Sequence, residues 1–359
     1  MKLLITGPNW FGNNVEYCKN AFSSFGYDIK VFYYNDSQSN KSFEYKKRIK
    51  RILLSSSNSF GHLIADFYKA LKKQYEKRQV VAANLELIKS CNEFKPNAIF
   101  ILKGETIYKE TIEQLIKKGI AVYYWWFDNP FEYAKTYEYL LDNFKMARHV
   151  FIIEPYYINL LGEAGINNVS YLGNGCEPLI YSDVKLSIDE RKKYECELSF
   201  VGTCYPRRYQ ILKNLMNYHL KIYGVQWFNY FNPEIINRTN TTIVEKIIAP
   251  EMQAKIFVCS KINLNFHRPN LITSSNQRTF EIACAGGFQL VHYKKLISEE
   301  FCEDREIVYY FDLNDLKDKI DYYLKNEDKR IEVAANAKRK CLDHFTYKKR
   351  IEGILQYIQ

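Results

Sequence analysis

The chain has 359 residues and a formal net charge of +10, and 47% of its residues are hydrophobic while 26% are charged. This composition excludes a globally disordered chain, and at roughly 100–200 residues per domain the length favours two domains. No apolar run approaches the ~18–20 residues of a membrane-spanning helix. The N-terminus turns polar too early for a secretion signal, so we expect a cytoplasmic protein.

The N-terminal half alternates apolar strands with helices. Strands are predicted at 2–6, 29–34, 98–102, 120–127, 149–153 and 169–172. Helices are predicted at 14–25, 82–94, 108–118, 131–143 and 155–163. Continuous apolar strands separated by helices indicate a parallel sheet that is covered on both faces. We therefore predict a doubly wound, Rossmann-like α/β domain over residues 1–175.

A basic segment at 41–79 interrupts this domain. It contains eleven Lys or Arg and three acidic residues, a local charge of +8. Helical patterns at 45–54 and 63–75 lie on either side of a Ser-rich loop. Three interpretations stay open, a solvated lysine face, a surface that binds anionic membranes and a surface that binds nucleic acid. We expect no nucleic acid partner, because no nucleic-acid-binding signature accompanies the charge.

The alternation restarts in the C-terminal half. Strands are predicted at 197–201, 220–223, 262–266, 288–292 and 307–310. Helices are predicted at 206–217, 250–258, 278–285, 294–301, 313–325, 327–343 and 346–359. We predict a second Rossmann-like domain over 176–343 and a C-terminal helix over 344–359. Two such domains would face a cleft, and ligands would bind at the carboxyl ends of the strands.

Several absent motifs narrow the chemistry. There is no Gly-x-Gly-x-x-Gly and no phosphate-binding loop ending in Gly-Lys-Ser/Thr, which disfavours dinucleotide enzymes and nucleotide hydrolases. There is no Gly-x-Ser-x-Gly elbow and no Asp-x-Asp pair for a divalent metal. The nine cysteines include no Cys-x-x-Cys pair, which favours buried reduced thiols. We therefore expect no metal and no cofactor.

The segment FVGTCYPRRYQIL at 200–212 reads as a strand, a glycine turn and a helix. Gly202 would let a ligand approach the backbone, and Arg207 with Arg208 would seat a phosphate near the start of the helix. Two solvated arginines in a first helical turn are the alternative. His267 and Arg268 follow the strand at 262–266 and are predicted to point towards the same donor ligand.

The segment SSNQRTFEIACAGGFQLVHY at 274–293 places three polar residues, Arg278, Thr279 and Glu281, at the start of a helix. Glu281 is either a partner of the helix dipole or an acceptor of hydrogen bonds from a ribose diol. In the second case Arg278, Thr279 and the amides of the helix start would lie beside a diphosphate.

Four residues of the N-terminal half are candidates for the acceptor side. Asp128 follows the strand at 120–127 and is the candidate base for an acceptor hydroxyl, although an Asx-type turn cap is the alternative. Glu105, after the strand at 98–102, is the second candidate. Trp10 and Asn13 follow the first strand and are predicted to touch the acceptor, with ordinary loop positions as the alternative.

These motifs resemble the donor half of GT-B glycosyltransferases and, more narrowly, the spore-maturation (CgeB-like) family. In the second half the matching segments are Phe200-Val201-Gly202 with Arg207 or Arg208, Asn263-Leu264-Asn265-Phe266, Arg278-Thr279-Phe280-Glu281-Ile282-Ala283-Cys284-Ala285-Gly286-Gly287, 313–324 and His344-Phe345-Thr346-Tyr347-x-x-Arg350. In the first half they are Trp126-Phe127-Asp128-Asn129-Pro130 and Tyr171-Leu172-Gly173-Asn174-Gly175. The resemblance covers roughly 95–359 and is weak over 35–80.

The resemblance implies a transferase that holds a nucleotide-sugar in its C-terminal domain and an acceptor in its N-terminal domain, with the last helix crossing back to the first domain. Glu281 would bind the ribose, and Arg278 with Arg207 or Arg208 would bind the diphosphate. The chain departs from many retaining relatives at Thr273, where they carry a second glutamate. The stereochemical outcome therefore stays open.

We expect a metal-independent glycosyltransferase that moves a sugar from a UDP-, GDP- or dTDP-linked donor to a glycan, lipid-linked or protein acceptor. Its expected setting is bacterial surface-polysaccharide assembly, on the inner face of the membrane through residues 41–79. Two alternatives remain, a nucleotide-sugar epimerase on the same fold and a non-catalytic basic protein that binds membrane or nucleic acid.

Overall fold

The computed structural model describes residues 1–9, 14–35 and 60–358, with side chains in the last range described from residue 73 onward. Its contacts divide the chain into two compact units. Unit 1 comprises 1–152, 157–170 and 357–359, and unit 2 comprises 153–156 and 171–356. The main division falls near the predicted end of the first domain at 175. The segment 344–359, which we predicted as separate, belongs to unit 2 as far as residue 356.

Unit 1 contains a six-stranded parallel sheet with the order β2-β1-β3-β4-β5-β6. Its strands are β1 Lys2–Gly7, β2 Asp28–Tyr33, β3 Ala98–Leu102, β4 Ala121–Trp126, β5 His149–Ile152 and β6 Val169–Tyr171. Its helices are α1 Asn14–Ser24, α3 Phe60–Phe94, α4 Lys109–Lys117, α5 Pro130–Ala134, α6 Leu140–Met146 and α7 Tyr156–Glu163. The doubly wound α/β class predicted for this half is confirmed.

Both faces of this sheet are buried, as the continuous apolar strands predict. Trp125 and Trp126 are adjacent on β4 and therefore point to opposite faces, and both are fully buried. The Trp126 ring packs edge-on against Tyr133 and Phe144, and the Trp125 ring lies against Phe100 on the other face. Both tryptophans therefore belong to the core.

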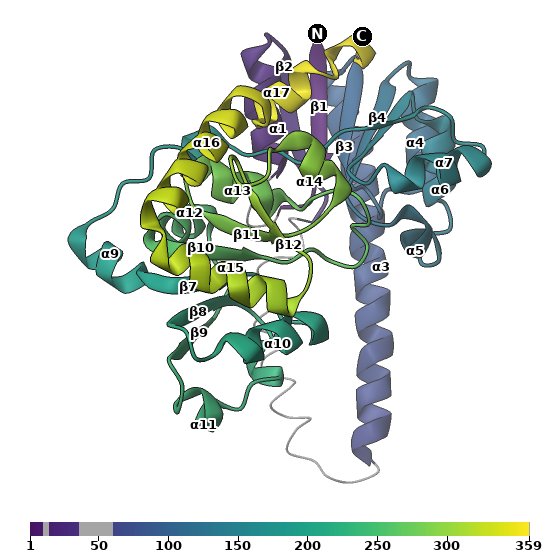
Figure 1. Cartoon of the computed structure of the whole chain (residues 1–359). Coiled ribbons are helices and arrows are strands. Elements are labelled where there is room, and N and C mark those ends of the chain that lie inside the picture. The colour runs from purple at the N-terminus through teal and green to yellow at the C-terminus, as the bar shows by residue number, and fades with distance from the viewer. Residues whose placement is uncertain (10–13, 36–59, 359) are drawn as a thin grey trace. The chain divides into compact units, whose positions relative to one another are not determined.

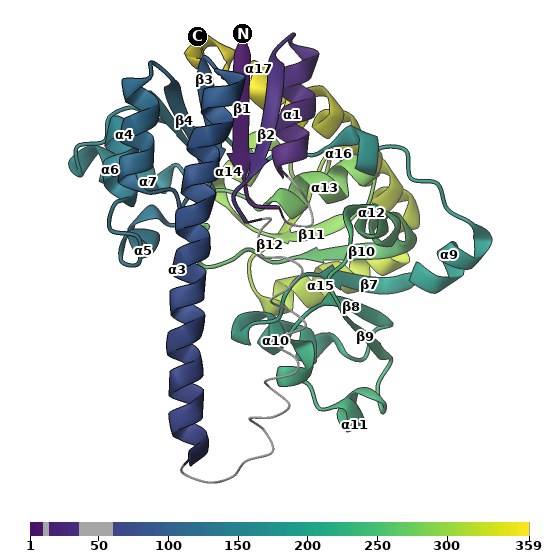
Figure 2. The same cartoon turned by 180° about the vertical axis from the view of Figure 1, so that it is seen from behind.

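Helix α3 is one continuous helix of 35 residues, whereas we predicted separate helices at 63–75 and 82–94. The intervening residues contain neither glycine nor proline, so nothing in the sequence stops the helix. Its C-terminal part lies beside the strands of unit 1 and its N-terminal part runs on past them (Figures 1 and 2). The predicted helix at 45–54 falls outside the described residues.

Unit 2 contains a second six-stranded parallel sheet with the order β12-β11-β10-β7-β8-β9. Its strands are β7 Cys196–Val201, β8 Leu220–Gly224, β9 Thr241–Glu245, β10 Ser260–Asn265, β11 Gln289–His292 and β12 Val308–Tyr310. Its helices are α8 Pro178–Tyr181, α9 Ile188–Tyr194, α10 Pro206–Leu212, α11 Pro233–Ile236, α12 Pro250–Cys259, α13 Gln277–Ala285, α14 Lys295–Glu300, α15 Leu313–Lys325, α16 Glu327–His344 and α17 Tyr347–Glu352. Strand β9 was not predicted, because its threonine-rich sequence lacks an apolar run.

Two apolar layers enclose this sheet. Phe257 of α12 and Phe280 of α13 belong to the layer on one face, and Leu212 of α10 and Leu316 of α15 belong to the layer on the other. Figure 1 shows α12 and α13 on one side of the strands and α15 on the other. The helices therefore leave the carboxyl ends of β7, β10 and β11 to the loops that carry the candidate site.

The end of the chain returns to unit 1. Helix α17 stops at Glu352, short of the predicted end at 359. The Tyr357 ring then lies 4.4 Å from the His149 ring, and the Ile358 carbonyl accepts a hydrogen bond of 3.2 Å from the Tyr27 hydroxyl. The last residues therefore pack on the unit in which the chain began.

Eight of the nine cysteines are buried, and Cys302 is exposed. Burial of most cysteines agrees with the prediction, and their reduced state stays a prediction. Within the described residues, no helix has the length and apolar character needed to cross a membrane.

Candidate active site

The start of helix α13 is fastened to the end of strand β10. Asn276 caps the helix by accepting a hydrogen bond of 3.1 Å from the Thr279 amide. Its side-chain amide donates to Asn265 Oδ1 at 2.8 Å and to the Phe266 carbonyl at 3.3 Å. The cap therefore also fixes where the helix start lies relative to the sheet.

Thr279 lies inside this fastening. Its side chain is fully buried, and its hydroxyl accepts from Asn265 Nδ2 at 2.9 Å. The Thr279 carbonyl accepts from Gln289 Nε2 at 2.9 Å, and Gln289 Oε1 accepts from Asn265 at 3.1 Å. We predicted that Thr279 contacts the nucleotide-sugar. In the structure its hydroxyl, amide and carbonyl all form hydrogen bonds within the protein, which gives it a positioning role.

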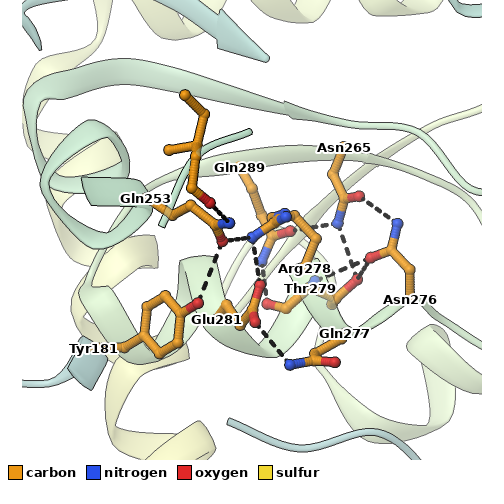
Figure 3. A network of polar contacts seen from close by, with 10 residues as sticks. Tyr181, Gln253, Asn265, Asn276, Gln277, Arg278, Thr279, Glu281 and Gln289 are labelled. Carbon is orange, nitrogen blue, oxygen red and sulfur yellow. Dashed lines mark hydrogen bonds and ion pairs between the residues drawn. The ribbon is translucent and has the colours of Figure 1, made fainter. Parts of the chain in front are cut away.

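Glu281 and Arg278 do come together, as Figure 3 shows. The Glu281 carboxylate is 3% exposed and accepts from Gln277 Nε2 at 2.8 Å and from Arg278 Nη1 at 2.5 Å. The Arg278 guanidinium also donates to Gln253 Oε1 and lies 5.3 Å from the Phe257 ring centre. A carboxylate held by an amide and a guanidinium is a preorganised acceptor for hydroxyl groups.

Arg208 is a buried clamp and not a solvated arginine. It donates to the Thr203 carbonyl and to the Phe266 carbonyl, both at 2.9 Å, and lies 4.3 Å from the Tyr205 ring centre. Burial lowers the pKa of Arg208 to about 10, which leaves it charged at neutral pH. A Cβ at Gly202 would lie 2.9 Å from its Nη1, so the predicted glycine gives room to the arginine.

Arg207, next to this clamp, is exposed and lies 3.3 Å from His292 Nε2. His267 is buried, whereas Arg268 is exposed. The structure gathers several of the predicted donor residues around a cavity of about 10 Å³, together with residues that we did not predict. Its lining includes Tyr205, Arg207, Arg208, Phe266, His267, His292 and Tyr310. Arg268, Arg278 and Glu281 are not part of this lining.

In unit 1, a lysine that we did not predict pairs with one of the two candidate acceptor-side acids. Lys103 follows β3, and its ammonium lies 2.9 Å from Asp128 Oδ2 and 3.1 Å from the Tyr133 hydroxyl. Glu105 Oε2 accepts from the Tyr34 hydroxyl at 3.1 Å. Burial opposes the charge on Lys103, but the charges of Asp128 and Glu105 outweigh it and raise the pKa of Lys103.

The cap of helix α5 comes from the neighbour of Asp128. Asn129 is the N-cap, and its side chain accepts from the amides of Phe131 and Glu132. The helix cap is thus supplied by Asn129, and both roles that we considered for Asp128 stay predictions. Asp128 instead forms a charged pair at the carboxyl end of a central strand, which suits a candidate base.

A buried carboxylate, Glu154, organises the loop before α13. It is 1% exposed and accepts from the amides of Ile272, Thr273 and Ser274 at 2.8–3.1 Å. Thr273 thus contributes a backbone donor to a glutamate that comes from the segment after β5. Six hydrogen bonds to this carboxylate leave it a structural anchor.

The sequence contained a usable signal for some of the residues that we missed. Lys103, Glu154 and His292 stand at or just after the ends of apolar strands, where ligand-binding residues gather. Gln253 lies inside a helix, and no local pattern separates it from other helical glutamines. Trp10 and Asn13 fall outside the described residues, so their acceptor roles stay predictions. Among the described residues, no group of three or more His, Cys, Asp or Glu side chains is arranged to hold a metal ion.

Comparison with known proteins identifies the class of the chain. Residues 207–356 match the family described as glycosyl transferase-like. The chain is 24% identical over 275 residues to spore protein CgeB of Bacillus subtilis (strain 168), covering 73% of this chain and 83% of CgeB. These matches and the shared fold support a glycosyltransferase enzyme of the GT-B fold that resembles CgeB.

Solved structures share its fold over the whole length. Sucrose-phosphate synthase from Thermosynechococcus elongatus is 9% identical with a TM-score of 0.68, covering 100% of this chain and 98% of its own. HepE from Anabaena, in complex with UDP-glucose, is 12% identical with a TM-score of 0.67, covering 100% and 99%. Of the three functions that we considered, the family match favours the glycosyltransferase over the epimerase and the non-catalytic binding protein. The shared fold agrees with the predicted GT-B fold.

The buried pair Lys103–Asp128 should stabilise unit 1 of the glycosyltransferase far more than a surface pair does. The Asp128→Asn variant leaves a buried ammonium with less compensation, so we expect it to lose about 3 kcal/mol in the free energy of unfolding. Asp142→Asn removes the pair Lys109–Asp142, also at 2.9 Å but with both side chains more than 40% exposed, and should lose at most about 1 kcal/mol. Urea titrations measure both.

The stabilisation by this pair has a defined pH range. Because the folded pKa of Lys103 is raised, its stabilisation is complete below about pH 10.4, the unfolded value for lysine. It is lost as the pH rises through the higher folded pKa. The difference in the free energy of unfolding between wild type and Asp128→Asn should therefore stay constant from about pH 7 to 9. If Asp128→Asn and Asp142→Asn lost equal stability, the stabilising role of the Lys103–Asp128 pair would be wrong.

Proposed function

We propose that this glycosyltransferase takes its sugar from a nucleoside diphosphate-sugar that binds unit 2, with a UDP-, GDP- or dTDP-linked donor. The observation that carries the proposal is the convergence of Arg207, Arg208 and His267 at the carboxyl ends of β7 and β10. Cationic groups at that edge of a parallel sheet suit a diphosphate. HepE, which shares the fold, is described in complex with UDP and glucose and with UDP-glucose.

The proposed role of Glu281 is to bind the ribose. Its carboxylate is already held in place by Gln277 and Arg278, and it has acceptor capacity on both oxygens for hydroxyl donors. The guanidinium of Arg278 lies beside it with 23% of its side chain exposed. A ribose diol that joined this network would fix the nucleotide relative to the start of α13.

The proposed chemistry uses fixed positive charge in place of a metal ion. Transfer breaks the bond between the anomeric carbon and a phosphate oxygen, and negative charge grows on that oxygen as the nucleoside diphosphate leaves. Arg207 and Arg208 would stabilise this charge through preorganised donors. Arg208 is preorganised by its two bonds to backbone carbonyls.

On the acceptor side, we propose that Asp128 removes the proton from the attacking hydroxyl in an inverting route. Asp128 has two carboxylate oxygens, one of which lies 2.9 Å from the Lys103 ammonium. The pair would keep the carboxylate oriented until substrate arrives. Glu105 is the second candidate for the same role.

We further propose that the acceptor is a lipid-linked or other glycan of bacterial surface-polysaccharide assembly, reached from the inner face of the membrane. The support is the charge of +8 within residues 41–79. Near an anionic leaflet, each Lys or Arg contributes about 1 kcal/mol. In helix α3, the side chains of residues 73–78 are exposed, which leaves their charges available to such a surface.

Calorimetry tests the donor site. Wild type should bind UDP in the presence of EDTA, and Glu281→Ala should weaken that binding by about 1–3 kcal/mol because a buried acceptor is lost. Glu299→Ala, in a helix of the same unit with 53% of the side chain exposed, is the matched control and should bind like wild type. The proposal is wrong if neither UDP, GDP nor dTDP binds.

Transfer from a radiolabelled donor to a bacterial lipid extract tests the base. Asp128→Asn should keep its affinity for UDP while transfer slows by about 10²–10⁴-fold, the usual contribution of a general base. Asp142→Asn serves again as the control with unchanged transfer. Unimpaired transfer by Asp128→Asn would move the role to Glu105, for which Glu105→Gln is the corresponding test.

Sedimentation with vesicles tests membrane binding. Vesicles rich in phosphatidylserine should bind wild type. A triple variant with Gln in place of Lys73, Lys77 and Arg78 should bind about 100-fold more weakly, because each lost charge contributes ~1 kcal/mol. Replacing Lys192, Lys193 and Lys325, exposed in unit 2, is the charge-matched control. Binding should fall with added salt, and an equal loss in the two triple variants would exclude a specific basic surface.

A further inference from the structure

His267 is a buried imidazole that receives no hydrogen bond from the described part of the chain. It follows β10 directly after Phe266, and it is 5% exposed. Neither Nδ1 nor Nε2 has a partner, and the residue is held instead through its backbone carbonyl, which accepts from the Tyr205 hydroxyl at 3.3 Å. Leaving a buried polar group unpaired costs about 1–3 kcal/mol, so this ring requires an explanation.

The cavity beside the ring is small and rich in hydrogen-bond donors. Arg207 and Arg208 of α10 line it, together with His292 at the end of β11 and Tyr310 of β12. The buried Nε of Arg208 and the Tyr310 hydroxyl are without partners as well. A volume of about 10 Å³ has room for roughly one oxygen atom. The cavity therefore suits a single oxygen of a larger anion whose remainder stays at the rim with Arg207.

The electrostatic surroundings of the ring are cationic. Burial lowers the pKa of His267 well below 6.5, and nearby positive groups add to this effect. These groups are Lys294, His292, Arg208 and Arg207. Tyr205 and Tyr310 are the other titratable groups that face the cavity, and burial raises the pKa of both. These surroundings favour the neutral ring, and a negative group that entered the cavity would favour the imidazolium.

We propose that this cavity receives one oxygen of the donor's diphosphate and that His267 becomes an imidazolium as it does so, so that nucleotide binding takes up one proton from solvent. The proposal rests on the proposed function, because it needs a nucleoside diphosphate in unit 2. A neutral imidazole has one N–H, and its other nitrogen is an acceptor, whereas the imidazolium has two donors for phosphate oxygens. The proton returns to solvent when the nucleotide leaves.

The same proton would assist the transfer step. As the glycosidic bond to phosphate breaks, both electrons of that bond stay with the phosphate oxygen. An imidazolium beside that group stabilises the added negative charge without itself forming a bond to the sugar. The nucleoside diphosphate product, which is more negative than the nucleotide-sugar, should hold the proton more strongly than the donor does.

Calorimetry in two buffers of different ionisation enthalpy counts this proton. At about pH 7.5 the terminal phosphate of UDP is largely ionised, because its second pKa is about 6, so the uptake reports on the protein. Wild type should take up about one proton more per bound UDP than His267→Gln, and its affinity should fall up to about tenfold per pH unit as the pH rises. His344→Gln, which replaces an exposed histidine of α16, is the control.

The outcomes separate this proposal from the proposed function. Equal proton uptake by wild type and a folded His267→Gln variant overturns the role of His267 while UDP binding stands. If UDP does not bind, the proposed donor fails, and proton-linked binding of inorganic pyrophosphate would still support the pocket; binding of neither ligand overturns both. If His267→Gln does not fold, ¹⁵N spectra of wild-type histidine rings with UDP decide, because an unchanged neutral ring would contradict the proposal.

Discussion

The side chain of Asn265 is the contact on which the geometry of the donor side depends. It is 1% exposed, at the last position of β10, and it bonds Thr279, Gln289 and Asn276 at once. Each of these bonds is modest, but removing Asn265 would take one hydrogen bond from each of the three residues, and the loss at the buried Gln289 Oε1 alone would cost about 1–3 kcal/mol. Because α13 carries Glu281 and Arg278, this network sets the position of both relative to the strand that ends in His267.

The Phe266 carbonyl connects that network with the cationic pocket. It accepts from Asn276, which caps α13, and from Arg208, which belongs to α10. Two helices that begin about seventy residues apart in the sequence are thus held by hydrogen bonds to the same backbone oxygen. Enzymes that stabilise developing charge without reorganisation need this kind of rigidity in their donors. The clamp also explains why a buried arginine is retained: its guanidinium is paired by carbonyls and aromatic rings, so its charge costs less to bury.

In unit 1, a turn with positive φ angles positions the candidate polar residues. Lys103 and Gly104 are consecutive residues with positive φ, at +61° and +77°. A lysine with positive φ costs about 1–2 kcal/mol. The resulting turn places the Lys103 ammonium beside Asp128 and the Glu105 carboxylate beside the Tyr34 hydroxyl. Strain of this kind persists where surrounding contacts over-determine it, which is common at functional sites. The two units therefore present opposite charge arrangements, an acidic pair around one lysine in unit 1 and clustered cations in unit 2.

The sequence by itself determined the α/β class, the positions of most strands along the chain and several boundaries, such as 98–102 and 313–325, because apolar runs and periodicity are local properties. It also determined that Trp125 and Trp126 point apart. Only the tertiary structure decided that α3 is one helix, that β9 exists, and that Asn129 and not Asp128 caps α5. It likewise decided the partners of Arg208 and Lys103 and the unpaired state of His267. The physical reason is the same in each case, because these features depend on which groups from distant parts of the sequence meet in a buried environment. There, gaining or losing a partner changes the free energy of folding by more than any local propensity does.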